Sequence, residues 1–128
     1  LAMAAAMLWR VPVLASDIDA VAVATTRANA RANGLSPWVT AVEAPGFRHP
    51  LIRGRAPYDL VMANILAGPL KRLAPDMARH LAPGGRAILS GILTRQAAGV
   101  EAVFAGHGLT RERLCVIGEW TSFLMRRV

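Results

Sequence analysis

Asn64 is the side chain best placed to do chemistry, because it ends an apolar run of strand length, Tyr58 to Ala63, and is followed by a helical pattern. Open α/β sheets bind their ligands beside the carboxyl ends of the strands, so this position predicts contact with a ligand. The carboxamide can donate and accept hydrogen bonds at the same time. Asparagine is also a good helix N-cap, and the spacing alone leaves both interpretations open.

Asp17 is the second candidate, because it stands with Asp19 between a predicted strand over residues 11–16 and a predicted helix over residues 20–33. In nucleotide-binding α/β folds, an acid at the end of the second strand accepts hydrogen bonds from ribose hydroxyls. Asp17 is placed for that role, and Asp19 is better placed as the helix N-cap. The alternative is that both aspartates only cap and solvate the start of the helix.

Hydrophobic periodicity predicts the elements that position these two residues. Residues 43–57 are rich in proline and glycine and are expected to form a long loop, with His49 as a surface residue and not a metal ligand. The alternating order, with a final hairpin, predicts an open, mainly parallel sheet with helices on both faces. We expect helices over residues 1–8, 20–33, 67–81 and 94–105, a turn over 82–85, and strands over 11–16, 38–42, 58–63, 86–91, 113–117 and 120–126.

The composition limits the classes of protein to consider. A chain of 128 residues with 54% hydrophobic residues fits one domain with a real core. No apolar run is long enough to span a bilayer, and Leu1 to Trp9 lacks the pattern of a signal peptide. The net charge of +7 comes from scattered arginines, which favours a solvated basic surface. Cys115 lies in an apolar stretch and is expected to be a buried thiol in a reducing compartment.

Six segments of the chain carry a family resemblance: Ser16–Asp19, Asn29–Gly34, Tyr58–Leu70, Leu81–Gly85, Leu89–Leu93 and Gly118–Trp120. Together they resemble the PrmA family, bacterial methyltransferases of a large-subunit ribosomal protein. The resemblance runs through nearly the whole chain. The block from Asn64 to Leu70, followed by Ser90 to Leu93, is its most specific part, whereas Asp17 and the Pro83–Gly85 turn are features of many methyltransferases.

The resemblance implies an S-adenosylmethionine-dependent enzyme with the Rossmann-like α/β fold of class I methyltransferases. Its sheet would have the strand order 3-2-1-4-5-7-6, with the seventh strand antiparallel in a carboxyl-terminal hairpin. Family members trimethylate amines of their ribosomal substrate protein. By the same resemblance, Asp17 would hold the ribose hydroxyls of the cofactor. Asn64 would bind the methionine end of the cofactor and act as the catalytic residue beside the incoming amine.

One departure from the family concerns the amino-terminal side. In the family, a first, central strand and a glycine-rich turn precede the helix that starts here at Leu1, and a substrate-recognition domain precedes both. We therefore expect residues 1–128 to be a single truncated methyltransferase domain that lacks the first strand. We also expect a cytoplasmic monomer whose partner is a large-subunit ribosomal protein, without a metal, a membrane or direct reading of nucleic acid.

Three alternatives remain open. The first is another class I methyltransferase, acting on RNA or a small molecule. Methyltransferases that act on planar amide or base nitrogens usually carry Asn-Pro-Pro-Tyr, and the absence of Pro-Pro-Tyr after Asn64 disfavours them. A dinucleotide-binding oxidoreductase is disfavoured because no Gly-x-Gly-x-x-Gly pattern is present. A non-catalytic fragment that only folds, or that binds RNA through its arginines, is the third alternative, and cofactor binding separates it from the enzymes.

Overall fold

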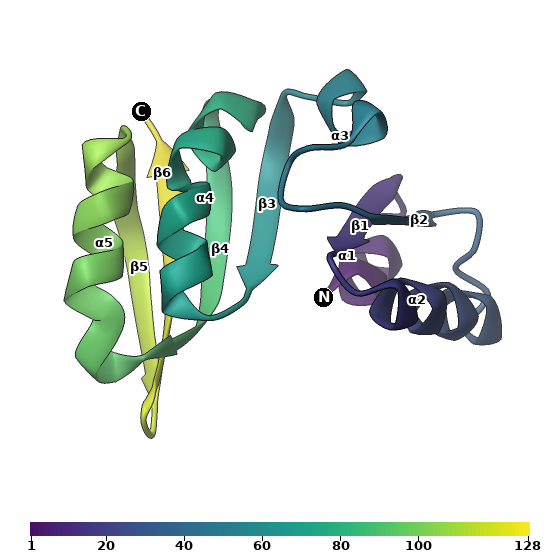
Figure 1. Cartoon of the computed structure of the whole chain (residues 1–128), viewed down its shortest axis with the longest axis horizontal. Helices are drawn as coiled ribbons and strands as arrows, with labels where there is room; N and C mark the ends of the chain where they lie inside the picture. Colours follow the sequence, from purple (N-terminus) through teal and green to yellow (C-terminus); the bar gives the residue numbers. More distant parts are fainter. The chain divides into compact units, whose positions relative to one another are not determined.

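The computed structural model describes all 128 residues and divides them into two compact units, Leu1–Gly54 and Arg55–Val128. Each unit has a sheet of its own, with two strands in the first and four in the second (Figure 1). No helix combines the length and the apolarity needed to cross a membrane. The division into units does not test the expectation of one domain over residues 1–128, which stays a prediction.

The first unit is built on two parallel strands whose pairing runs from Val13 opposite Val39 to Asp17 opposite Glu43. Small side chains let both of its longer helices pack closely on one face of this pair: Ala6 and Ala30 are buried together against Val39. The elements of this unit are α1 (Ala2–Trp9), β1 (Val13–Asp17), α2 (Ala20–Ala32), β2 (Val39–Glu43) and α3 (Pro50–Gly54).

Helix α2 begins and ends at the predicted signals. The Asp19 side chain accepts a hydrogen bond of 2.8 Å from the backbone N–H of Val21, which is the bond of an N-cap. The helix stops before Gly34, whose φ of +67° lies in the left-handed region that ends helices. The prediction that Asp19 caps this helix is therefore confirmed.

The loop predicted over residues 43–57 contains a short helix that was not predicted, α3. Pro50 occupies its first position, where a missing N–H costs nothing. The ring nitrogen Nδ1 of His49 accepts a hydrogen bond of 3.1 Å from the backbone N–H of Leu51. His49 thus caps the start of α3, a role that the sequence did not indicate, and its side chain is partly exposed. In the whole chain, no three His, Cys, Asp or Glu side chains gather as a metal site would require.

The second unit has the strand order β3-β4-β6-β5, with β3 and β4 parallel and β6 antiparallel to both of its neighbours. This is the order that the family resemblance implied for the last four strands, with the antiparallel strand inserted second from the edge. The elements are β3 (Tyr58–Asn64), α4 (Ala67–His80), β4 (Leu81–Leu93), the short 3₁₀ turn η1 (Thr94–Gln96), α5 (Ala97–Gly106), β5 (Leu109–Ile117) and β6 (Trp120–Arg127).

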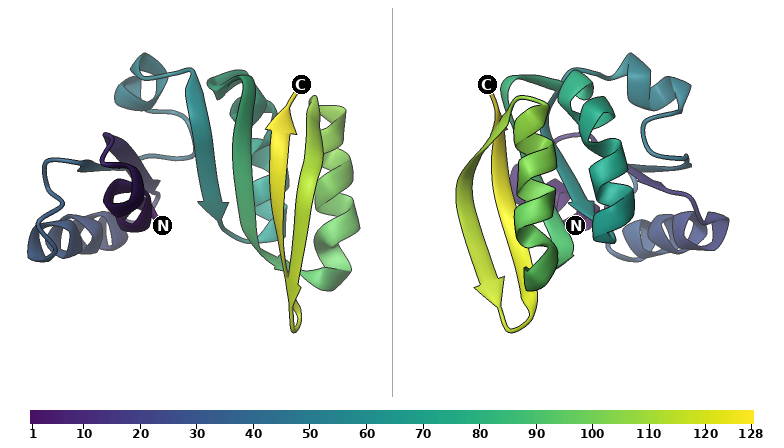
Figure 2. Two further views of the ribbon diagram at one scale, coloured as in Figure 1. Left: turned by 180° about the vertical axis from the view of Figure 1, so that it is seen from behind. Right: turned by 60° about the vertical axis from the view of Figure 1, so that its left-hand side comes forward.

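The core of the second unit lies between its sheet and two helices, α4 and α5, that cover the same face (Figure 2). The predicted apolar stripe of α4 supplies Leu70 and Met77, which are completely buried. Phe104 of α5 and Leu89 and Phe123 of the sheet are buried with them. A helix with one apolar face is stable mainly through this kind of packing, so the periodicity predicted the element correctly.

The turn predicted over residues 82–85 lies inside the bounds of β4. Tyr58 of β3 is paired with Leu81, and Leu60 is paired with Arg86, so residues 82–85 stand opposite Asp59 alone. Gly84 has a φ of +75°, which a turn requires and a regular strand does not. The predicted change of direction is therefore present as a large bulge, and the strand continues on both sides of it.

Cys115 is exposed, so the prediction of a buried thiol was wrong. It lies on β5, the edge strand, in register with Ser122 of β6. Of this strand only Leu109 is buried, and the tip of the β5–β6 hairpin, near Cys115, extends past the end of α5 (Figure 1). Leu114 and Ile117, which made the surrounding stretch look like core, are exposed as well.

An ion pair joins two strands that are not neighbours. Arg86 of β4 reaches over β6 and donates two hydrogen bonds to the carboxylate of Glu112 on β5, of 2.7 Å from Nε and 3.2 Å from Nη2. This hydrogen bonding, helped by the charges of Arg86, Arg126 and Arg113, lowers the pKa of Glu112 below its usual value. The pair is exposed, so its contribution to stability is modest.

A Glu112→Gln substitution should lower the melting temperature at pH 7 more than at pH 3. A carboxyl whose pKa is depressed in the folded state stabilises the fold above the unfolded pKa of about 4.3, and this stabilisation is lost as the pH falls through the lower folded pKa. Thermal unfolding of both proteins from pH 7 to pH 3 measures the effect, with Glu119→Gln as a control for the change of net charge. A difference in melting temperature that does not change with pH contradicts the assignment.

Candidate functional site

Asn64 is the last residue of β3, and its side chain is exposed. Its carboxamide makes no hydrogen bond within the chain. The N-cap of the following helix is Leu66, whose side chain has no hydrogen-bonding group and cannot cap. An asparagine that served as N-cap would accept a hydrogen bond from the first turn of the helix. The structural interpretation of Asn64 as the helix cap is therefore wrong, and its donor and acceptor groups are available to a ligand.

The side chain of Asn64 lies against the next strand of the sheet. Asn64 is paired with Ser90 of β4, and Ser90 accepts a hydrogen bond of 3.2 Å from the hydroxyl of Ser122 on β6. A Cβ atom placed on Gly91, the next residue, would lie 2.9 Å from Oδ1 of Asn64. The carboxamide is thus bordered by β4 on one side and is open on the other.

In the sequence, Ser90 and Gly91 stand out only as part of the family motif, without an assigned role. The signal was present, because a glycine inside a strand marks a bulge or a close approach of another backbone. What the sequence lacked was the register that brings Gly91 beside Asn64.

A hollow lies at the carboxyl end of β4, beside the turn of the β5–β6 hairpin. Its volume is about 240 Å³, and it is lined by residues of both segments, Leu93, Thr94, Arg95, Gly118 and Glu119. A typical small-molecule pocket holds roughly 300–1,000 Å³, so this hollow by itself is too small for a complete nucleoside cofactor.

Asp17 is the last residue of β1, in the first unit, and its side chain is exposed. One carboxylate oxygen accepts a hydrogen bond of 2.9 Å from the backbone N–H of Asp19, and the other has no partner in the chain. The main-chain oxygen of Asp17 accepts from the N–H of Ala44 at 2.9 Å, which fixes the end of the strand. A carboxylate held in this way, with one oxygen free, fits an acceptor of hydroxyl hydrogen bonds.

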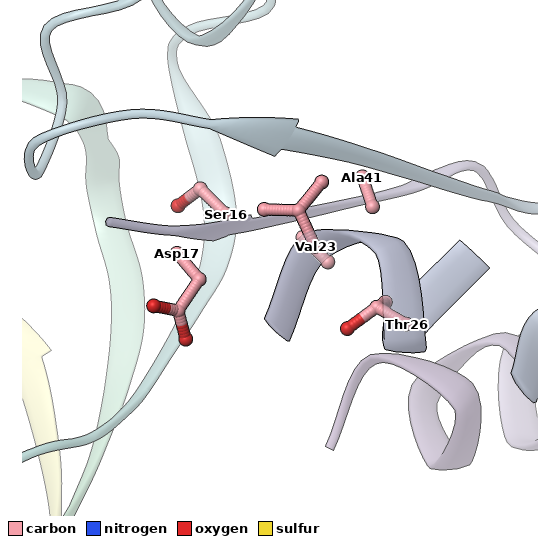
Figure 3. A pocket seen from close by; sticks show the side chains of 6 residues that line it. Ser16, Asp17, Val23, Thr26 and Ala41 are labelled. Atoms are coloured by element: carbon pink, nitrogen blue, oxygen red, sulfur yellow. The ribbon is translucent and has the colours of Figure 1, made fainter. Parts of the chain in front are cut away.

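A small hollow borders Asp17. Its volume is about 50 Å³, enough for a water molecule or a hydroxyl but not for a nucleoside. Ser16 and Asp17 project to opposite sides of β1, as neighbours on a strand do (Figure 3). The lining residues are Ala15, Ser16, Asp17, Val23, Thr26 and Ala41. Asp17 and Asn64 belong to different compact units, and the structure describes each of them within its own.

The α/β elements, the parallel strand pairs and the antiparallel β6 define the fold of a class I methyltransferase. A solved methyltransferase from Pyrococcus furiosus has the same fold, with a TM-score of 0.76 at 19% identity over 98% of this chain and 66% of that chain. A ribosomal protein L11 methylase from Lactobacillus delbrueckii subsp. bulgaricus matches with a TM-score of 0.90 at 28% identity, over 99% of this chain and 64% of that chain.

The chain belongs to the PrmA family, because the family model described as ribosomal protein L11 methyltransferase (PrmA) matches residues 1–128. The ribosomal protein L11 methyltransferase of Chelativorans sp. is 51% identical over 127 residues, which are 99% of this chain and 44% of that protein. The corresponding protein of Mesorhizobium japonicum is 48% identical over 126 residues, 98% of this chain and 43% of that protein. The chain thus spans less than half the length of these curated relatives.

Proposed function

We propose that the full-length protein transfers methyl groups from S-adenosylmethionine to amines of ribosomal protein L11. The names of the relatives in the family support this substrate. The observation that carries the proposal is the exposed carboxamide of Asn64, which has no partner within the chain and stands at the carboxyl end of β3. This is the edge at which open α/β sheets bind their ligands. We place this activity in the cytoplasm and assign it to a monomer.

The chemistry requires placement more than acid–base catalysis. When bound, S-adenosylmethionine supplies an electrophilic methyl group on its sulfonium. The Oδ1 atom of Asn64 accepts an N–H from the neutral amine and so directs the nitrogen lone pair toward that methyl. The methyl group would pass from the sulfonium to the amine nitrogen, with S-adenosylhomocysteine as the leaving group. The proton of the resulting ammonium would leave to water, because the carboxamide of Asn64 is not a base. Correct alignment of this kind is worth roughly 7–11 kcal/mol of the barrier.

Asp17 is the residue that we assign to the cofactor ribose. Its free carboxylate oxygen can accept hydrogen bonds from ribose hydroxyls, and such charge-assisted bonds are stronger than neutral ones. A solved RNA methyltransferase from Salinibacter ruber, which shares only the fold at a TM-score of 0.73 and 16% identity, is in complex with S-adenosyl-L-homocysteine. It supports a cofactor of this type for the fold.

The proposal is tested by incubating the full-length protein with methyl-labelled S-adenosylmethionine and, separately, purified ribosomal protein L11 or ribosomal RNA. We expect label in L11 alone, and mass spectrometry of its peptides should show increments of one methyl group on amines. Label in RNA alone supports the competing RNA methyltransferase and overturns the proposal. Absence of label, together with no binding of S-adenosylhomocysteine by calorimetry, supports the non-catalytic alternative.

A further inference from the structure

Gly91 occupies an irregular position in β4. Its φ is +77°, a conformation that side chains with a Cβ atom rarely adopt. The pairing of β4 with β6 shifts register between Leu89 and Ile92, so Gly91 lies within this irregularity. A bulge of this kind bends the strand, and this one lies beside Ser90, the partner of Asn64 across the parallel pair.

The segment that follows β3 lies directly on Gly91. A Cβ atom at this position would be 2.8 Å from the carbonyl oxygen of Ile65, 2.9 Å from Oδ1 of Asn64 and 3.1 Å from the backbone nitrogen of Ile65. Ordinary contacts of a Cβ atom begin at 3.4 Å. Two of the three atoms belong to the backbone, so they cannot rotate away. A side chain on residue 91 would therefore push the Asn64–Ile65 segment outward.

We propose that Gly91 is a positioning residue for methyl transfer. Its missing side chain lets the Asn64–Ile65 segment lie against β4, and this close approach fixes the position of the Asn64 carboxamide relative to β4. This inference rests on the proposed role of Asn64. The Ile65 oxygen would have to move from 2.8 Å to at least 3.4 Å to admit a Cβ atom. A displacement approaching about 1 Å at a reacting group can cost about a hundredfold in rate, so a shift of this size matters for a residue that orients an amine.

The chain offers two matched control glycines. Gly108 has a φ of +81°, and a Cβ atom there would meet nothing within 4 Å. Gly108→Ala thus reproduces the backbone strain of position 91 without the contact. Gly85 has no such φ, but a Cβ atom there would lie 2.9 Å from the oxygen of Ala82 and 3.0 Å from that of Tyr58. Gly85→Ala thus reproduces the crowding at the opposite end of β3 from Asn64.

The test compares Gly91→Ala with both controls in the full-length protein. We expect kcat for L11 methylation to fall by about tenfold to a hundredfold in Gly91→Ala and by less than about twofold in the controls. The affinity for S-adenosylhomocysteine, measured by calorimetry, should stay within about threefold of wild type. The side-chain amide resonances of Asn64 in nuclear magnetic resonance spectra, identified by their absence in Asn64→Ala, should shift in Gly91→Ala and stay in place in Gly108→Ala.

A double-mutant comparison shows whether the two residues act through one group. In the Asn64→Ala background, Gly91→Ala should lower kcat by less than about threefold more, because residues that act together are not additive. Full multiplication of the two effects overturns the proposal, as does an unchanged kcat or an equal loss in Gly85→Ala. If Gly91→Ala does not fold while both control variants do, the glycine serves the fold alone, and the proposal is overturned. If Asn64→Ala itself keeps full activity, the proposed function of Asn64 fails instead.

Discussion

Replacing Asn64 with alanine should lower kcat for methylation of ribosomal protein L11 by about a hundredfold, while the affinity for S-adenosylhomocysteine stays within about threefold. Loss of one preorganised hydrogen-bonding group at a reaction centre typically costs about a hundredfold to a thousandfold in kcat. The cofactor keeps its other contacts, so an effect confined to kcat locates the missing interaction in the transition state. Single-turnover kinetics and calorimetry measure the two quantities separately.

Asn64→Asp makes a sharper test, because it keeps the shape and the acceptor oxygen of residue 64 but adds a negative charge. A carboxylate beside the substrate amine stabilises its protonated form and raises the pKa of the amine. Since only the neutral amine attacks, kcat should fall near neutral pH and recover as the pH rises. The pH–rate profile of Asn64→Asp should therefore be displaced to higher pH relative to wild type.

Asn33 provides the matched control for these variants. Its side-chain amide is also exposed, but it donates a hydrogen bond of 2.8 Å to the main-chain oxygen of Asn29 at the end of α2. Asn33→Ala should lower the melting temperature slightly and leave kcat unchanged. Near-normal turnover in Asn64→Ala would show that the exposed carboxamide has no part in the reaction.

The positions of both site residues at strand ends were predictable from the chain because each follows a run of strand residues and precedes an amphipathic helix. Asp17 closes β1 and Asn64 closes β3, in agreement with that pattern. The close approach of Gly91 to the Asn64 carboxamide was not predictable. It depends on the register of β3 with β4, which is a property of the folded sheet that neither strand's own sequence determines.

The two errors in the fold have separate physical causes. Helix α3 has only five residues, too few for a hydrophobic period to be visible, and its start is formed by a histidine ring in place of a usual capping residue. Cys115 was expected to be buried because its neighbours are apolar. An apolar stretch indicates what a segment prefers, but an edge strand such as β5 is buried only where other elements cover it.

Asp17→Ala should weaken the binding of S-adenosylhomocysteine by about 1–3 kcal/mol, which corresponds to roughly fivefold to a hundred-and-fifty-fold in the dissociation constant. The loss arises because ribose hydroxyls lose a charged acceptor when the complex forms. At saturating cofactor, kcat should stay within about threefold of wild type, since the carboxylate is assigned to binding and not to the transfer step. Titration calorimetry with the full-length protein measures the change in affinity.

Local structure has to be separated from contact with the ligand, because Asp17 also accepts the hydrogen bond from the N–H of Asp19. Asp19→Ala removes the cap of α2 and should cost about 1 kcal/mol of stability while leaving the proposed ribose acceptor in place. Its affinity for S-adenosylhomocysteine should therefore be close to that of wild type. Asp17→Asn keeps an oxygen for the Asp19 N–H and should fall between wild type and Asp17→Ala.

The decisive comparison changes the ligand together with the residue. Wild type should bind the 2′,3′-dideoxy analogue of S-adenosylhomocysteine more weakly than the parent compound, by about the same 1–3 kcal/mol. Asp17→Ala should bind the two compounds almost equally, because the group that distinguishes them is gone. Any general loosening of the first unit affects both ligands alike and cancels in this double difference. If the analogue loses as much affinity in Asp17→Ala as in wild type, the ribose hydroxyls are held by another residue.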